Sequence, residues 1–401
     1  MRLLICAGGT GGGVYPALAV LKVLTEAQDG RLRTKDERRR TIEISDPSLV
    51  VPGQSFEVLW VGGIGGMEAD LIKREGLPFV AIPAAGVHGV GLRALPHNLW
   101  QVGRGFLAAR RVIRRFRPEV MFFTGGYLAV PVALASRLPG TARPHPANLL
   151  YVPDIEPGLA LRTLARYADH IALTVEDSKA FFSLRTPLTV TGYPTRREVQ
   201  SWTGETARRA LNLSPEIPTV LVFGGSKGAR SINRALLTGL PDLLAEMQII
   251  HVSGYLDWPE VESSKAGLNP QLKARYLAYP YLHTEMGAAM RVADLVVSRA
   301  GASALGEYPL FGLPAVLVPY PHAWRYQEVN AHYLAERGAA LILADADLPT
   351  QLVPTVRGLI ADQSRRNAMR RAMLSLAHPE AAESIATLLL RLATTQDQER
   401  N

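Results

Sequence analysis

Two short apolar runs in this 401-residue chain each lead through a glycine-rich loop into a helical pattern. The first run is 3–5, and five of the six residues in its loop, 8–13, are glycine. The second run is 220–223, followed by Gly-Gly-Ser-Lys-Gly at 224–228. Glycine lets the backbone approach an anion, and a helix N-terminus points N–H groups and partial positive charge at it. The repeat predicts two similar α/β domains, each with a phosphate-binding loop.

Strand-like and helix-like segments alternate along most of the chain. In the first half the pattern predicts strands at 3–7, 57–61, 79–82, 120–124, 147–152, 170–173 and 188–191. In the second half it predicts strands at 219–223, 247–252, 295–298, 315–319 and 340–343. Such alternation is typical of doubly wound parallel sheets, which bind ligands at the carboxyl ends of their strands. We expect two Rossmann-like domains, 1–195 and 196–375, with a cleft between them, and a C-terminal helix and tail at 376–401.

The segment from about 28 to 54 interrupts the alternation. It contains a charge run at 35–40, followed by Pro47 and Pro52. This composition favours a surface insertion over a further strand or helix of either domain.

Composition excludes several classes of protein. A single cysteine, Cys6, excludes an intramolecular disulfide and a zinc site built from cysteines. No run of 18 apolar residues is present, and the apolar segment before the first glycines is too short for a signal peptide. We therefore expect neither a membrane span nor a secretory leader. The net charge of +8 favours an anionic partner.

Residues 98–116 form the pattern of an amphipathic helix rich in arginine. Its apolar stripe contains Leu99, Val102, Phe106, Ala109, Ile113 and Phe116, and arginines occupy 104, 110, 111, 114, 115 and 117. The preceding loop, 87–95, is apolar apart from one histidine and one arginine. An apolar loop beside a basic helix is typical of proteins that bind an anionic bilayer surface. Interleaved aromatic residues are missing, so we expect no nucleic-acid partner.

Two polar segments follow strands of the second half. After 295–298, Ala302 and Ser303 offer backbone N–H groups at a predicted helix start, and Glu307 lies one turn further on. A carboxylate at that place can accept two hydrogen bonds from a ribose diol. After 315–319, Gln327 and Asn330 are three residues apart, and we expect both to face the cleft.

Four ordered motifs resemble the MurG family: Gly-Gly-Thr-Gly-Gly at 8–12, Gly-Gly-Tyr at 125–127, and the segments 224–230 and 298–307. MurG enzymes are peripheral transferases that move N-acetylglucosamine from UDP-N-acetylglucosamine to lipid I, giving lipid II for peptidoglycan. The resemblance implies a GT-B fold, with the lipid-linked acceptor in the N-terminal domain and the UDP-sugar in the C-terminal one. It also implies inverting transfer without metal or cofactor, at the cytoplasmic face of the cell membrane.

The resemblance also assigns roles to residues of this chain. In the donor half, Ser226, Lys227, Ala302, Ser303 and Arg196 would contact the diphosphate, Glu307 the ribose, Gln327 the sugar hydroxyls, and Tyr281 and Leu282 the uracil. In the acceptor half, the polyprenyl-linked diphosphate would lie against Thr10, Gly11, Gly12, Gly13 and Tyr127.

The acceptor half departs from the family pattern at two places. Gly13 stands where the family has a histidine, and Tyr-Val-Pro-Asp at 151–154 stands where it has His-Glu-Gln-Asn. Glycine cannot transfer a proton, so the general base is sought elsewhere, with Asp154, His88 and Glu156 as candidates.

Three hypotheses follow from these departures. The chain is a divergent lipid II-forming transferase, a related transferase with another lipid or secondary-metabolite acceptor, or a nucleotide-sugar-binding protein with weak or no transfer. We favour the first, because the apolar loop and the basic helix of the family are retained.

Overall fold

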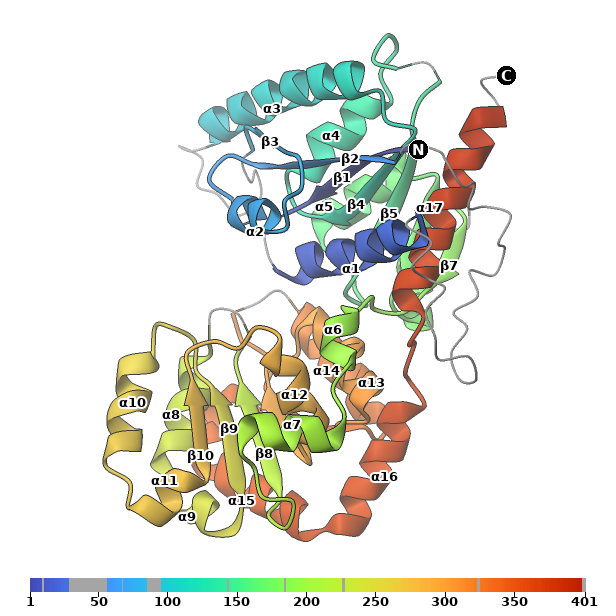
Figure 1. The fold of residues 1–401 in the computed structure, drawn as a ribbon. Helices are drawn as coiled ribbons and strands as arrows, with labels where there is room; N and C mark the ends of the chain where they lie inside the picture. Colours follow the sequence, from blue (N-terminus) through green and yellow to red (C-terminus); the bar gives the residue numbers. More distant parts are fainter. Residues whose placement is uncertain are drawn as a thin grey trace. The chain divides into compact units, whose positions relative to one another are not determined.

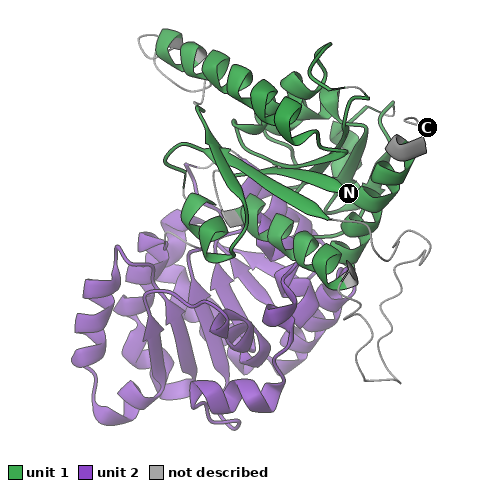
Figure 2. Cartoon of the chain, turned by 45° about the horizontal axis from the view of Figure 1, so that its top comes forward, with its two compact units in different colours: residues 1–194, 380–401 green, residues 195–379 purple. Residues whose placement is uncertain are grey.

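The computed structural model describes residues 1–8, 11–28, 56–66, 68–84, 95–142, 144–183, 185–225, 228–322 and 325–398. The predicted insertion, apart from residue 28, and the predicted site residues Thr10, His88, Ser226 and Lys227 lie outside these ranges. The chain forms two compact units, coloured separately in Figure 2. Unit 1 consists of Met1–Pro194 and Glu380–Asn401, and unit 2 of Thr195–Pro379.

The sheet of unit 1 is parallel throughout, in the order β3-β2-β1-β4-β5-β6-β7 (Figure 1). Its strands are β1 Arg2–Ala7, β2 Glu57–Gly63, β3 Phe79–Ile82, β4 Val120–Gly125, β5 Ala147–Val152, β6 His170–Leu173 and β7 Leu188–Val190. All seven strands predicted from the sequence are confirmed, with ends that differ by at most two residues. Central strands such as β1 and β4 are almost fully buried, as expected of strands covered on both faces.

Helices cover both faces of this sheet. They are α1 Gly11–Gln28, α2 Glu68–Arg74, α3 Leu95–Phe116, α4 Ala129–Ser136, α5 Leu159–Leu164 and α17 Ala381–Gln398, with short 3₁₀ turns η2 Ala165–Tyr167 and η3 Glu176–Phe181. Ala109 and Ile113 of α3 pack with α4 and α5 against Leu4 and Cys6 on one face. On the other face α17 packs against α1 and the strands β4 and β5. The last helix of the chain therefore completes the core of the N-terminal unit.

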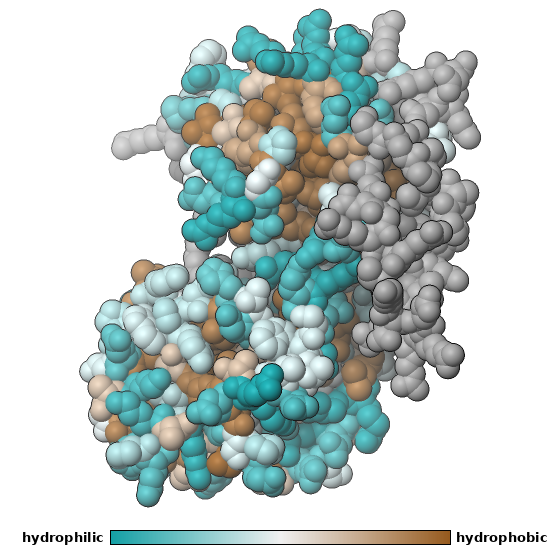
Figure 3. Space-filling view, viewed as in Figure 1, coloured by the Kyte–Doolittle hydropathy of each residue, from teal (hydrophilic) through white to brown (hydrophobic). Residues whose placement is uncertain are grey.

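The helix α3 keeps one side buried and the other exposed, as its sequence pattern predicted. Ala109 and Ile113 are 1% and 0% exposed, whereas Trp100 and Leu107 are 66% and 53% exposed. In Figure 3 hydrophobic residues gather over the middle of the unit 1 face that is in view, with hydrophilic residues around them. Within the described ranges, no helix is both long enough and apolar enough to cross a membrane.

The sheet of unit 2 is also parallel, in the order β10-β9-β8-β11-β12-β13. Its strands are β8 Thr219–Phe223, β9 Gln248–Val252, β10 Tyr276–Tyr279, β11 Leu295–Ser298, β12 Ala315–Leu317 and β13 Ala340–Ile342. Five of these were predicted, and β10 was missed. It is a four-residue edge strand in which buried and half-buried residues alternate, and two of its four residues are tyrosines, so it lacks an aliphatic run.

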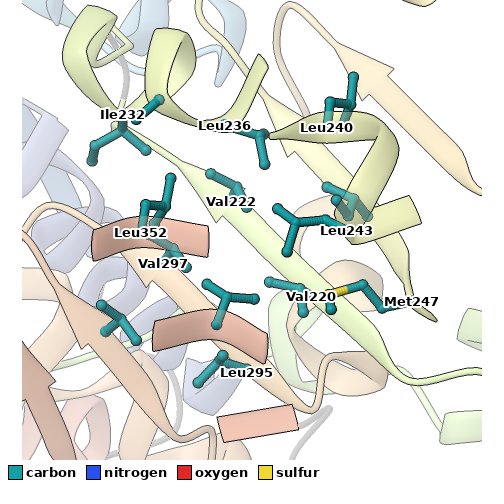
Figure 4. Close-up of a cluster of buried hydrophobic side chains, with 14 of the residues drawn as sticks. Val220, Val222, Ile232, Leu236, Leu240, Leu243, Met247, Leu295, Val297 and Leu352 are labelled. Atoms are coloured by element: carbon teal, nitrogen blue, oxygen red, sulfur yellow. The ribbon is translucent and has the colours of Figure 1, made fainter. Parts of the chain in front are cut away.

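Both faces of this second sheet also carry helices. They are α6 Arg197–Gln200, α7 Gly204–Leu211, α8 Arg230–Thr238, α9 Leu240–Glu246, α10 Trp258–Ala266, α11 Pro270–Ala274, α12 Glu285–Val292, α13 Glu307–Phe311, α14 Tyr326–Glu336, α15 Leu348–Ala361 and α16 Gln363–Leu374, with 3₁₀ turns η4 Ala302–Leu305 and η5 Asp345–Asp347. Ile232 and Leu236 of α8 and Leu352 of α15 pack on Val222 and Val297 (Figure 4). This core fixes the start of α8, and with it the glycine loop.

The return of α17 to unit 1 yields a test. Leu389 is 0% exposed on this helix, so Leu389→Ala should lower the free energy of unfolding by about 2–5 kcal/mol. Hydrogen exchange should show the loosening in α1, β4 and β5, and not in α8 or α15. Arg391→Ala, on the exposed side of the same helix, should change stability by less than about 0.5 kcal/mol. Loosening confined to unit 2 would contradict the placement of α17.

Candidate functional site

The glycine loop after β8 brings backbone against backbone. A Cβ at position 224 would lie 2.2 Å from the amide nitrogen of Ala229, and one at 228 would lie 2.2 Å from the carbonyl oxygen of Ser253. Gly225 and Gly228 also have φ values of 86° and 78°, which side-chain-bearing residues rarely adopt. The loop leads into α8, as predicted for a phosphate-binding turn, while Ser226 and Lys227 within it lie outside the described residues.

Three predicted donor residues, Arg196, Ser303 and Glu307, come together in unit 2. The Ser303 side chain is hydrogen-bonded to the Glu307 carboxyl group, and Arg196 is close enough to interact with it electrostatically. Burial of the carboxyl raises the pKa of Glu307 to about 7, although the serine and the arginine both act to lower it. The residue as a whole keeps part of its surface accessible. The cluster is thus a desolvated acid beside a cation at the carboxyl end of the sheet.

The helix expected from residue 302 is divided in two. The 3₁₀ turn η4 covers Ala302–Leu305, and α13 begins at Glu307 after Gly306. Ala302 and Ser303, both partly buried, are the first residues of that turn. Ser303 and Glu307 nevertheless meet, so the predicted pairing of their side chains is retained despite the break.

The polar residues after β12 have two different positions. Gln327 accepts a hydrogen bond from the Tyr320 N–H at 2.9 Å through its side-chain oxygen, and thereby holds the loop before α14. Asn330 is fully buried and donates to the carbonyl of Ala300 at 3.2 Å. The expectation that both face a cleft is therefore wrong for Asn330, which joins α14 to the segment after β11.

One supporting residue was missed in the sequence. Arg299, 10% exposed in its side chain, donates to the carbonyl of Val318 at 3.1 Å, to Asp345 at 2.5 Å and to Ser231 Oγ at 2.9 Å. It thereby ties together the segments after β11, β12 and β13 and the first turn of α8. Its signal in the sequence is an arginine placed directly after a buried apolar strand, where charge is rarely found without a partner.

The predicted uracil residues follow β10. Tyr281 and Leu282 are both partly buried. The Tyr281 ring is adjacent to those of Tyr255 and His283, with centroids 6.4 Å and 4.8 Å away. These residues share the carboxyl edge of the sheet with the glycine loop, because all strands of the sheet are parallel.

In unit 1 the helix α1 begins at Gly11 and places Gly13 against β4. A Cβ at position 13 would lie 2.9 Å from Oγ1 of Thr124, a residue that is 3% exposed. Among the residues that the structure describes, this hydroxyl has no hydrogen-bond partner. The loop after β4 also contacts the one after β1, since a Cβ at Gly126 would lie 3.0 Å from the Gly8 carbonyl oxygen. Tyr127 is 53% exposed beside them.

The candidates for the general base differ in their surroundings. Asp154, partly buried after β5, lies close enough to Tyr151 that its charge adds to burial in raising the pKa of that phenol. Glu156 is 6% exposed and forms an ion pair with Arg162 at 3.0 Å. Glu156 is therefore buried in an ion pair, and Asp154 is the more exposed of the two candidates that the structure describes.

Within the described ranges, no three side chains of histidine, cysteine, aspartate or glutamate gather in the way that a metal site needs.

Comparisons with known proteins cover nearly the whole chain. The family model described as "Glycosyltransferase family 28 N-terminal domain" matches residues 51–173, and that of the "C-terminal domain" matches 219–385. A relative from Roseiflexus sp. (strain RS-1) is 39% identical over 97% of this chain and 94% of its own. It is named UDP-N-acetylglucosamine–N-acetylmuramyl-(pentapeptide) pyrophosphoryl-undecaprenol N-acetylglucosamine transferase. This chain belongs to the MurG family.

Further comparisons agree with membership of the MurG family. A relative of the same name from Desulforudis audaxviator is 37% identical over 98% of this chain and 99% of its own. The crystal structure of Acinetobacter baumannii MurG superimposes with a TM-score of 0.69, at 24% identity, over 97% of this chain and 99% of that one. The expected GT-B fold, two Rossmann-like parallel-sheet domains, is confirmed.

The contact between Gly13 and Thr124 predicts how the family histidine would fit this chain. Gly13→His alone should destabilise unit 1 by roughly 1–3 kcal/mol, because its Cβ overlaps the Thr124 hydroxyl. Adding Thr124→Ala removes that oxygen and should recover most of the loss. Urea unfolding measures both. Gly103→His, at a helical glycine with no atom within 4 Å of its added Cβ, is the matched control and should not be destabilising. Equal stability of wild type and Gly13→His would contradict the overlap.

Proposed function

We propose that this chain transfers N-acetylglucosamine from UDP-N-acetylglucosamine to lipid I, forming lipid II for peptidoglycan at the cytoplasmic face of the cell membrane. The observation that carries the proposal is the Arg196–Ser303–Glu307 cluster at the carboxyl end of the unit 2 sheet. A carboxylate with a serine and a cation beside it suits a ribose diol next to a diphosphate. The family's named donor contains both groups.

The proposed reaction is a single displacement at the anomeric carbon. The acceptor hydroxyl attacks that carbon, the bond to the β-phosphate oxygen of UDP breaks with its electron pair, and the configuration inverts. Negative charge grows on the departing diphosphate. Arg196 and the backbone N–H groups of the glycine loop would stabilise this charge, because preorganised donors in a desolvated site act most strongly where charge develops.

The proton of the acceptor hydroxyl needs a recipient in unit 1, and we assign it to Asp154. Gly13 offers no side chain, and of the two described candidates after β5, Asp154 is partly buried whereas Glu156 is only 6% exposed. Asp154 follows β5, which pairs with β4, the strand that leads to the Gly-Gly-Tyr segment. A positioned base typically contributes about 10²–10⁴-fold to the rate.

The raised pKa of Glu307 gives the test of the donor site. Its carboxyl titrates near pH 7, so the ionised form that accepts two ribose hydrogen bonds is present above pH 7 and lost below it. The KM for UDP-N-acetylglucosamine should rise by up to about tenfold per pH unit as the pH falls below 7. Glu307→Gln, which keeps the shape without the charge, should raise the KM above pH 7 and flatten this dependence.

Transfer to a soluble lipid I analogue is the assay, and Glu246→Gln, at an exposed ion pair with Arg357 on another part of unit 2, is the control. Transfer whose pH profile is the same in wild type and Glu307→Gln would refute the ribose assignment. Absence of transfer from UDP-N-acetylglucosamine in the wild type would refute the function itself.

We also propose that α3 docks on an anionic bilayer. Trp100 and Leu107 are exposed on this helix, and Arg104, Arg111 and Arg115 are exposed along it. Tryptophan and leucine at headgroup depth beside arginines are typical of helices that lie in the membrane interface. Such docking would bring the acceptor loops of unit 1 to a lipid-linked substrate.

Vesicle binding tests this docking. Each of Arg104→Gln, Arg111→Gln and Arg115→Gln should weaken binding to vesicles with phosphatidylglycerol about fivefold, the effect of about 1 kcal/mol per basic residue near the surface. Trp100→Ala should weaken binding by removing an interfacial anchor. The controls are Arg365→Gln and Arg371→Gln, which make the same charge change on the exposed side of α16 in unit 2. These controls should weaken vesicle binding less than the α3 variants do. Equal losses from both helices would point to net charge alone and contradict docking by α3.

A further inference from the structure

The loop between β9 and α10 presents two large apolar side chains to solvent. Tyr255 is 68% exposed and Leu256 is 76% exposed. Exposed apolar side chains are common singly, but two in succession on a firmly held loop suggest a contact surface.

Buried polar residues anchor both ends of the loop. Asn233 of α8, 1% exposed, donates to the Ser253 carbonyl and to Asp257, each at 2.9 Å. His251, fully buried, bonds to Asn233 at 3.0 Å and to the Tyr276 hydroxyl at 2.7 Å. Burial lowers the pKa of His251 to about 3, so the ring stays neutral and this network is uncharged at its centre. The exposure of Tyr255 is therefore a property of a fixed loop.

The same loop lies directly against the glycine loop. The Ser253 carbonyl oxygen is 2.2 Å from where a Cβ of Gly228 would be, so only glycine permits this approach. The end of β10 also holds Ser253 in place, because the Ser253 N–H donates a hydrogen bond to the Tyr279 carbonyl at 3.0 Å. Tyr255 is thus held between the predicted diphosphate loop and the end of β10.

The ring of Tyr255 is nearly parallel to that of Tyr281. Their centroids are 6.4 Å apart and their planes differ by 9°, while His283 meets Tyr281 edge-on at 4.8 Å. The two rings form a stacked pair at the outer end of the usual range, and the exposed Tyr255 can offer an aromatic face to a third ring. Every nucleobase has a π-face that can stack on such a surface.

We propose that Tyr255, together with Tyr281, forms an aromatic wall on which the pyrimidine base of the donor stacks. This inference rests on the proposed function, since it places the base of the nucleotide whose diphosphate binds at the glycine loop. Tyr255 acts on donor affinity, and its contribution is independent of the acceptor.

Calorimetric binding of UDP to the full chain tests the proposal. Tyr255→Ala should raise the Kd for UDP by roughly 5- to 150-fold, the range found for loss of one base–aromatic stack. Tyr255→Phe keeps the ring and should bind UDP like the wild type. Leu256→Ala removes an equally exposed side chain from the same loop and should also leave the Kd unchanged.

A ligand without a base separates stacking from distortion of the loop. Ribose 5-diphosphate should compete with UDP-N-acetylglucosamine equally well in wild type and Tyr255→Ala. Equal loss for both ligands, or a Leu256→Ala effect as large as that of Tyr255→Ala, would overturn the proposal. An unchanged Kd for UDP in Tyr255→Ala would overturn the stacking proposal and leave the proposed function standing. A wild type that does not bind UDP would instead overturn the proposed function.

Discussion

Both units depend on places where two loop backbones touch with no room for a side chain. In unit 2 the glycine loop meets Ser253 at Gly228, and in unit 1 the loop after β4 meets the Gly8 carbonyl at Gly126. These contacts bring the ends of neighbouring parallel strands to one edge. A β-carbon at either place would push the loops apart. The close approach of the loops at these edges therefore depends on glycine, which has no β-carbon.

Near the glycine loop of unit 2, Arg299 and Glu307 are largely removed from water and lie beside polar partners. Arg299 is satisfied by Asp345, Ser231 and main-chain carbonyls, so it acts as a fixed support between loops. Glu307 has Ser303 and Arg196 beside it, yet burial still dominates its pKa. The first arrangement is typical of a structural ion pair. The second leaves a titratable acid near neutrality, which is typical of a binding site that awaits a polar ligand.

Most strands could be predicted because a parallel strand covered on both faces is a short apolar run, as in β1 and β8. The edge strand β10 lacked that run and was missed. The pattern of α17 indicated an apolar face but carried no information on which unit would cover it. Spacing brought Ser303 and Glu307 together correctly, although Gly306 breaks the helix between them. The prediction from spacing was wrong for Asn330, because helical periodicity indicates which side of a helix a residue lies on but not how deeply that residue is buried.

The loss of the family histidine is best understood through Thr124. Its hydroxyl lies under Gly13, so the space that a side chain at 13 would enter is already partly filled from β4. The departure is therefore built into the packing of unit 1 and involves more than one residue. In the proposed reaction, the proton of the acceptor hydroxyl would then need a recipient other than a side chain at position 13. Asp154 follows β5, which pairs with β4, so it lies at the same edge of the sheet, where Glu156 forms an ion pair with Arg162.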